Sequence, residues 1–255
     1  MEKITSRKNP YIVHLRQLAA SSEYREEQKE YICDSLKLLK EAVQFGVKVT
    51  SVLWRGLPDS AEGFPSLSGE TKQYAAPEDL FDYASPMKNS PGPLFTCAFP
   101  ENSKKTEIRN AVILENVQDP GNVGTVIRTA NAFGISEVIL TGACADLYSP
   151  KTVRATMGAI FRQKIEKMSR EDLAAFLEET GLPLYGAVLS DRAVSLRDID
   201  ITRAAVAVGS EGRGLSREFI EMCAGEIIIP MQPGSESLNA AMAGTVLMWE
   251  MSKQN

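Results

Sequence analysis

Short apolar runs that alternate with helical stretches constrain the fold of this 255-residue chain more than any other feature. From residue 111 onward, the pattern predicts strands at 111–117, 137–141, 184–189, 204–208 and 226–230. These runs lack polar alternation, which is typical of strands covered on both faces of a parallel sheet. We therefore predict a doubly wound α/β domain, in which ligands bind beyond the carboxyl ends of the strands.

The first hundred residues contain a second alternation of strands and helices. The pattern predicts strands at 30–33, 49–54 and 94–99, and a helix with one apolar face over 35–45. A polar stretch at 101–107 then interrupts it. We therefore divide the chain into a first domain over 1–100, a linker over 101–107 and a second domain over 108–255.

Charge and apolar content exclude several classes of protein. The net charge is −5, so the overall basic excess that indicates nucleic-acid binding by itself is absent. No apolar run approaches the roughly 18 residues of a membrane helix, and the N-terminus has no apolar leader. We therefore expect a cytoplasmic protein without membrane contact. The four cysteines show no Cys-x-x-Cys spacing, so we expect no metal site.

Basic side chains are nevertheless concentrated in two stretches. One lies near the start, at 3–16, and the other at 128–170 contains seven basic and three acidic side chains. Such patches bind phosphate groups locally even on an acidic protein. Ordinary scattered surface lysines are the alternative explanation.

The first loop with candidate chemistry follows the strand at 111–117. Asp119 and Pro120 predict a helix start, and Gly134 predicts its end. Asn122 then lies in the first turn, with Arg128 under two turns further along. A helix N-terminus with an arginine in reach is an anion site, whereas a capped helix with a solvated arginine is the alternative.

The second loop is rich in glycine. Gly209, Gly212 and Gly214 follow a predicted strand in the order G-x-x-G-x-G, which is the reverse of the dinucleotide fingerprint, and Glu211 lies among them. No P-loop motif occurs anywhere in the chain. The spacing indicates backbone that approaches a ligand closely, or a turn with positive φ.

The third loop joins the strand predicted at 226–230 to the last helix. Residues 227–229 are β-branched, and Pro230 ends the run. Ser237 occupies the position expected for the N-cap of that helix, and Asn239 follows in its first turn. The two side chains either only cap and fill the turn, or place a hydroxyl and an amide beside a ligand.

In order and spacing, these loops resemble the three motifs of the SpoU (TrmH) family of RNA ribose 2'-O-methyltransferases, within the knotted SPOUT superfamily. The matching segments are 122–128, 209–215, and 229–231 with 237–239. The resemblance covers residues 108 to about 253, and residues 1 to about 95 resemble the substrate-binding domain of the family, which has a ribosomal-protein-like α/β fold. Where relatives usually have Glu-Gly, this chain has Asp34 and Ser35.

The resemblance implies an enzyme that methylates a ribose 2'-hydroxyl in structured RNA with S-adenosyl-L-methionine. The catalytic residues that it implies are Asn122, Arg128, Glu211, Ser237 and Asn239. It also implies a cofactor that lies bent in a trefoil knot, near Leu189, Gly209, Ile229, Met231 and Leu238. For RNA phosphates, we expect contacts from Lys3, Arg7, Lys8, Lys151, Arg154 and Arg162.

The chemistry of methyl transfer leaves the role of Arg128 open. A ribose hydroxyl is a poor nucleophile at neutral pH, and the only histidine, His14, lies in the first domain, far in sequence from the three loops. The family model gives the activating role to the arginine of the first motif. Because an arginine side chain stays protonated, orientation of an RNA phosphate by Arg128 is an equal alternative.

The resemblance further implies a homodimer formed through the second domain. The last helix has an apolar stripe suited to such a contact, formed by Met242, Val246 and Trp249, although the same residues could cover the sheet of their own chain. Ribosomal RNA is favoured over transfer RNA by the habit of the family alone. A catalytically inactive RNA-binding protein is the main alternative, and an adenine-nucleotide enzyme is a distant third.

Overall fold

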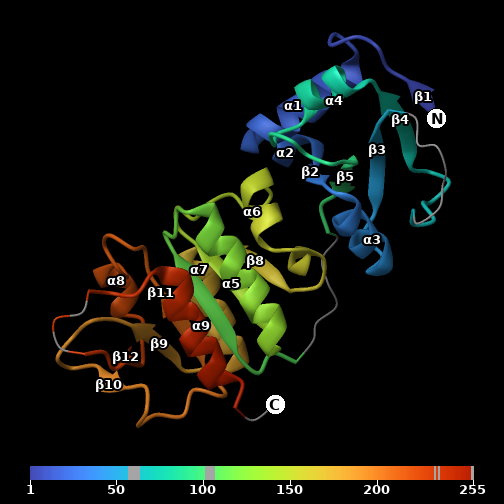
Figure 1. The fold of residues 1–255 in the computed structure, drawn as a ribbon. Helices are drawn as coiled ribbons and strands as arrows, with labels where there is room; N and C mark the ends of the chain where they lie inside the picture. The colour runs from blue at the N-terminus through green and yellow to red at the C-terminus, as the bar shows by residue number, and fades with distance from the viewer. Residues whose placement is uncertain (57–63, 101–106, 233, 235, 254–255) are drawn as a thin grey trace. The chain divides into compact units, whose positions relative to one another are not determined.

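The computed structural model describes the chain except for residues 57–63, 101–106, 233, 235 and 254–255. Its contacts form two compact units (Figure 1), which are Met1–Ser103 with Asp146–Phe161, and Lys104–Ala145 with Arg162–Asn255. Apart from residue 107, the expected linker at 101–107 lies outside the described residues. The segment Asp146–Phe161, which the sequence places in the second domain, groups with the first unit.

The first unit is built on a five-stranded mixed sheet with the order β1-β4-β3-β5-β2. Its strands are β1 (Glu2–Lys3), β2 (Glu30–Asp34), β3 (Val49–Arg55), β4 (Lys72–Ala76) and β5 (Leu94–Ala98). Its helices include α1 (Pro10–Ala20), α2 (Ser22–Gln28), α3 (Leu36–Gln44) and α4 (Glu78–Ala84). The three predicted strands and the predicted helix are confirmed as β2, β3, β5 and α3.

Two apolar clusters cover the two faces of this sheet. One joins α1 and α4 to the strands and includes the fully buried Leu15 and Phe81. The other joins α3 to the strands and includes Leu39 and Phe95. It also contains Val153, from the helix α6 (Pro150–Ala155) within the segment Asp146–Phe161.

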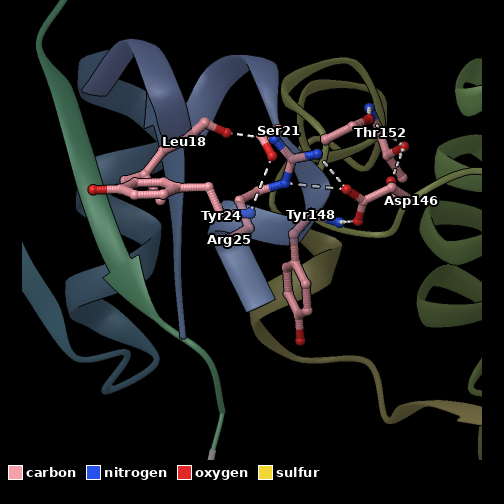
Figure 2. A network of polar contacts seen from close by, with 8 residues as sticks. Leu18, Ser21, Tyr24, Arg25, Asp146, Tyr148 and Thr152 are labelled. Atoms are coloured by element: carbon pink, nitrogen blue, oxygen red, sulfur yellow. Dashed lines mark hydrogen bonds and ion pairs between the residues drawn. The ribbon is translucent and has the colours of Figure 1, made fainter. Parts of the chain in front are cut away.

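A buried arginine holds that segment in the first unit. Arg25, on α2, is only 4 % exposed and donates from Nε to Oδ2 of Asp146 at 3.0 Å, and from Nη2 to the same oxygen (Figure 2). Its third donor, Nη1, reaches the carbonyl of Leu18. The amide of Tyr148 donates to Oδ1 of Asp146 at 2.9 Å, so the carboxylate also shapes the start of the segment.

Aromatic side chains complete this attachment. The ring of Tyr148 lies 4.1 Å from that of Phe99 and 4.7 Å from that of Tyr31, measured between centroids. Offset contacts of this kind add to the stabilisation from burial itself. An ion pair with a buried arginine, an aromatic cluster and a core valine thus all connect the segment Asp146–Phe161 to the rest of the first unit.

The second unit is a seven-stranded sheet in which every pairing is parallel, with the order β10-β12-β9-β11-β6-β7-β8. The strands are β6 (Ala111–Glu115), β7 (Glu137–Thr141), β8 (Ile165–Met168), β9 (Leu184–Ala187), β10 (Val194–Ser195), β11 (Ala205–Val208) and β12 (Gly225–Ile228). All five predicted strands are confirmed in place, although four have shorter bounds. The parallel α/β class expected from the sequence is therefore confirmed.

Helices lie on both faces of this sheet. They are α5 (Pro120–Phe133), α7 (Arg170–Thr180), α8 (Arg217–Ile220) and α9 (Ala240–Met251). Helices α7 and α8 pack on the face of β6 that carries Ala111 and Ile113. Helices α5 and α9 lie side by side (Figure 1), and they contact β7 and β11 respectively. Because the strands are parallel, all of their carboxyl ends lie at one edge.

Two helix starts at this edge bear on the site. Asp119 caps α5 as predicted, since its Oδ1 accepts from the amide of Asn122 at 2.8 Å, and Gly134 ends the helix with a φ of 67°. The expected cap of the last helix is wrong. Asn239, and not Ser237, accepts from the amides of Ala241 and Met242, so α9 begins at residue 240.

Candidate functional site

Three of the candidate catalytic residues form one chain of hydrogen bonds at the carboxyl edge of the parallel sheet. Nδ2 of Asn122 donates to Oε1 of Glu211, and Nδ2 of Asn239 donates to Oδ1 of Asn122 at 3.1 Å. The first turn of α5, the loop after β11 and the N-terminus of α9 therefore meet at one point. The folded chain thus joins the three loops singled out in the sequence.

Helix capping fixes the orientation of these amides. Oδ1 of Asn239 is occupied by the first amides of α9, which leaves Nδ2 as the group that faces Asn122. The backbone amide of Asn122 is in turn held by Asp119. The capping contacts at the starts of α5 and α9 therefore fix the positions of Asn122 and Asn239.

Arg128 is differently placed. It lies on α5 six residues after Asn122, which corresponds to a rise of about 9 Å along the helix. Its side chain is exposed and has no hydrogen bond or ion pair with the residues that the structure describes. Its guanidinium group is therefore free to meet an incoming anion.

A cavity of about 440 Å³ adjoins the polar chain. Its walls are the loops after β9, β11 and β12 together with the start of α9, and it includes Glu211 and Ser237. All five residues that the sequence assigned to cofactor binding line it: Leu189, Gly209, Ile229, Met231 and Leu238. Its volume is in the range typical of small-molecule sites.

The loop after β11 closes on itself. A Cβ atom on Gly209 would lie 2.1 Å from the carbonyl carbon of Gly214 and 2.3 Å from the amide nitrogen of Leu215. Gly214 adopts a φ of 66°, and its amide donates to the carbonyl of Ser210 at 2.8 Å. Glycine at 209 is therefore required by the fold of the loop itself, so a larger residue there would disturb the loop whether or not a ligand touches it.

Sequence reasoning did not single out Glu115 as functional. It ends β6, is only 2 % exposed, and accepts from the amide of Ser216 at 2.8 Å and from its hydroxyl at 2.6 Å. Ser216 follows the glycine loop and caps α8. Glu115 thus ties the loop that carries Glu211 to the sheet. The sequence contains one sign of this role, because the Glu115 carboxylate directly follows four apolar strand residues.

The expected RNA-binding residues are divided between the two units. Lys3, Arg7, Lys8 and Lys151 are exposed in the first unit. Arg154, also in the first unit, lies with Nη1 3.7 Å from Oδ2 of Asp34. Arg162 belongs to the second unit and donates to Asn131 at 3.2 Å. The basic stretch at 128–170 is therefore not one surface of one unit.

Within the described residues, histidine, cysteine, aspartate and glutamate side chains form no group of three or more that could hold a metal ion. None of the described helices is both long and apolar enough to cross a bilayer.

Comparison with known proteins adds to this geometry. Residues 109–249 match the SpoU rRNA Methylase family. The chain belongs to the SpoU rRNA methylase family. Among SpoU relatives, a tRNA/rRNA methyltransferase of Synechocystis, itself uncharacterized, is 30 % identical over 98 % of this chain and 93 % of its own length. The 23S rRNA (guanosine(2553)-2'-O)-methyltransferase RlmP of Bacillus subtilis is 27 % identical over 98 % of this chain and 99 % of its own.

Solved structures resemble the whole chain. The AdoMet-bound rRNA methyltransferase of Sinorhizobium meliloti superposes with a TM-score of 0.87 at 26 % identity, covering 99 % of this chain and 98 % of that one. The SpoU methyltransferase AviRb of Streptomyces viridochromogenes, in complex with AdoMet, gives a TM-score of 0.86 at 25 % identity, covering 97 % and 98 %. Similarity to SpoU proteins therefore extends over both units.

Proposed function

We propose that this protein transfers a methyl group from S-adenosyl-L-methionine to a ribose 2'-hydroxyl of ribosomal RNA. Glu211 carries the proposal, because it lines the cavity and also belongs to the chain of hydrogen bonds with Asn122. A methyl donor in the cavity would therefore face the polar side chains of all three SpoU motifs. Relatives named as 23S rRNA 2'-O-methyltransferases support ribosomal RNA as the substrate.

The cavity suits the cofactor in volume and in the chemistry of its lining. Apolar side chains such as Ile229 and Leu238 border one part, while Glu211 and the backbone of the glycine loop border another. This mixture fits a ligand with a purine ring and a charged amino-acid end. S-adenosyl-L-methionine supplies an electrophilic methyl group there. We further propose that these loops form the trefoil knot expected from the SPOUT resemblance.

Arg128 is the candidate that meets the RNA. Its exposed guanidinium can hold the phosphate next to the target ribose by two parallel hydrogen bonds, which orients the 2'-hydroxyl for in-line attack. We propose that Asn122, Glu211, Ser237 and Asn239 position the ribose and the phosphate and, once RNA is bound, Arg128. In the alternative assignment, Arg128 activates the 2'-hydroxyl itself, with help from an RNA phosphate.

Substitution of Arg128 tests the proposal. We expect Arg128→Ala to lower single-turnover methyl transfer to unmodified large-subunit ribosomal RNA by at least about 100-fold, with cofactor affinity within about twofold. Arg128→Lys retains the charge but loses the planar fork, so it should fail as well. Arg217→Ala, which removes an exposed arginine of the same unit, is the control. Full activity of Arg128→Ala would refute the assignment.

We also propose that the first unit supplies RNA phosphate contacts, through Lys3, Arg7, Lys8, Lys151 and Arg154, and that Arg162 adds one from the second unit. Their cationic side chains suit a polyanion, and binding should weaken steeply with added salt. The cytoplasm is the compartment that we propose for the protein.

A homodimer completes the proposal. Met242, Val246 and Trp249 lie on one stripe of α9, and Met242 and Trp249 are 60 % and 59 % exposed. A stripe of large apolar side chains on a helix is suited to contact with a second copy. We expect Trp249→Glu to convert a dimer into a monomer in sedimentation equilibrium. Val13→Glu, at an exposed apolar position of the first unit, should leave the dimer intact.

A further inference from the structure

The first unit contains a cavity of its own, of about 590 Å³. It lies among α1, the chain that follows α3, and the first residues of β3 and β4. None of the residues of the three SpoU motifs lines it. Its walls include Tyr11, His14, Glu30 and Thr50, and the lysines Lys48 and Lys72.

The hydroxyl groups of Tyr11, Thr50 and Ser51 line one wall of the cavity, and that of Thr96 lies behind them. Ser51 lies directly opposite Thr96 on β5 and Lys72 on β4, and a shift of register beside Thr50 marks a bulge in β3. Ser51 Oγ bonds to Thr96 Oγ1 at 2.6 Å and to the hydroxyl of Tyr11 at 2.8 Å. Thr96 is fully buried, and its hydroxyl group is hydrogen-bonded, as buried polar groups generally are.

The only histidine of the chain extends this set of polar groups. His14 Nε2 lies 2.9 Å from a carboxylate oxygen of Glu30, and Nδ1 lies 2.9 Å from the hydroxyl of Tyr24. Burial alone would raise the pKa of Glu30, but hydrogen bonds from His14 and Thr50 hold that pKa below its usual value. An ionised Glu30 only accepts, so Nε2 carries a proton. Thr50 also bonds to Thr96, which joins both parts into one network.

The cavity combines three kinds of recognition group. The rings of Tyr11 and Tyr74 stack with centroids 4.0 Å apart and form an aromatic wall. Glu30 and the hydroxyls offer hydrogen bonds. Of the exposed charged residues that line the cavity, Lys48 and Lys72 are positive and Glu70 is negative, so the two lysines leave an excess of positive charge there. Proteins recognise unpaired RNA nucleotides by aromatic contact, by hydrogen bonds to the base edges and by cations near the phosphate.

We propose that this cavity binds one unpaired nucleotide of the substrate RNA, with the base against Tyr11, Tyr74 and Glu30 and the phosphate near Lys48 and Lys72. This inference rests on the proposed function, since it names how the first unit engages the same RNA. The cavity thereby contributes to the choice of substrate from outside the methyl-transfer site.

The single histidine gives a direct measurement. In full-length protein labelled with ¹³C-histidine, the imidazole signals report on His14 alone. We expect saturable shifts on titration with at least one of the four nucleoside 5'-monophosphates and with single-stranded trinucleotides that contain it. Ribose 5-phosphate and inorganic phosphate are the controls. Absence of any nucleotide-induced shift at millimolar concentration, or an equal shift with ribose 5-phosphate, would overturn the proposal.

Paired lysine variants test the same cavity in the enzyme. We expect the double variant Lys48→Ala/Lys72→Ala to bind the nucleotide about tenfold more weakly, because charge-assisted contacts are lost. It should raise KM for large-subunit ribosomal RNA while kcat and cofactor affinity stay unchanged. Lys37→Ala/Lys40→Ala removes two exposed lysines of α3 outside the cavity and should change neither. Equal behaviour of the two double variants would refute the proposal.

These measurements separate this inference from the proposed function. If unmodified protein binds nucleotides at His14 but transfers no methyl group to RNA, the proposed function fails and the cavity assignment stands. If methyl transfer is normal and His14 does not respond, only the cavity assignment fails.

Discussion

At the scale of single residues, Glu115 shows how a buried carboxylate can act on the reaction without contacting substrate. It is bonded through both oxygens to Ser216, which follows the loop carrying Glu211. Loss of the carboxylate leaves the amide and hydroxyl of Ser216 without these partners. A buried donor without a partner costs about 1–3 kcal/mol. Ser216 is only partly buried, so we place the cost of losing both bonds within that range, which is enough to let the loop relax.

We therefore expect Glu115→Ala to lower the free energy of unfolding by about 2 kcal/mol and to reduce kcat more than it raises KM for RNA. Glu115→Gln keeps one acceptor for the amide and should recover most of kcat. Steady-state kinetics and urea unfolding measure the two effects. Glu221→Ala, which removes an exposed carboxylate just after α8, is the control. A stability loss without any loss of kcat in folded Glu115→Ala would show a purely structural role.

The sequence predicts which polar residues form the site better than it predicts which helix each one caps or which partner it bonds. Asn122, Glu211 and Asn239 were identified from their loops, and the fold brings them into contact. The sequence predicts Ser237 as the cap because it stands just before the apolar run of the last helix. Serine and asparagine both cap well, so only the path of the backbone shows that Asn239 is the cap. The role of Glu115 could not be read because its partner is 101 residues away.

At the scale of secondary-structure elements, the start of β7 contains an unusual ion pair. Glu137 is fully buried, and Nζ of Lys164 lies 3.2 Å from each of its carboxylate oxygens and 3.2 Å from Glu166. Burial raises the pKa of Glu137 to about 7, against the opposing effect of Lys164. The strands β7 and β8 are neighbours in the sheet, so the Glu137 carboxyl gains or loses its proton between two paired strands.

The raised pKa makes stability depend on pH. Between about pH 4.5 and 7, folded Glu137 holds a proton that the unfolded chain has released, so its contribution to the free energy of unfolding falls as pH rises. We expect the loss between pH 5 and pH 8 to be smaller in Glu137→Gln by roughly 2–3 kcal/mol, as measured by urea unfolding. Glu166→Gln, which removes a more exposed carboxylate beside the same lysine, should retain most of the loss. An identical pH profile for Glu137→Gln and the unmodified protein would contradict the assignment.

Buried strands are easier to predict from the sequence than strands at the edge of the sheet. The central strands β6, β7 and β11 each contain a buried apolar run of three or more residues, and these runs predict them. The edge strands β8 and β10 were missed, because β8 reads Ile-Glu-Lys-Met and β10 has only two residues. Residue 229 was assigned to a strand, but β12 ends at Ile228 and leaves Ile229 at the cavity. Propensity alone does not show where pairing stops.

At the scale of the whole molecule, sequence order and structural unit do not coincide. The segment Asp146–Phe161 lies inside the part of the sequence matched to the SpoU family, yet it packs with the first unit. No periodicity could reveal this, because the attachment depends on a contact between Arg25 and Asp146. For Asp146, burial alone would raise the pKa, but hydrogen bonds from Arg25 and from the amide of Tyr148 hold it below its usual value.

A truncated chain of residues 108–255 therefore removes more than an RNA-binding domain. It deprives Asp146, Tyr148 and Val153 of the partners that bury or pair them in the first unit. We expect hydrogen exchange across 146–161 to be fast in this fragment, while cofactor affinity is retained, because the 440 Å³ cavity is formed by residues of the second unit alone.

Full-length Arg25→Met separates the attachment from the loss of the first unit. We expect this variant to lower the free energy of unfolding by about 2–3 kcal/mol, because the partly exposed Asp146 loses its charged partner. The increase in hydrogen exchange should be largest within 146–161. Arg16→Met, which removes an exposed arginine of α1, is the control and should leave that segment protected. If hydrogen exchange across 146–161 in the fragment is as slow as in the full-length protein, the segment keeps its structure without the first unit. Any weaker RNA binding by the fragment would then be due to the loss of residues 1–107 alone.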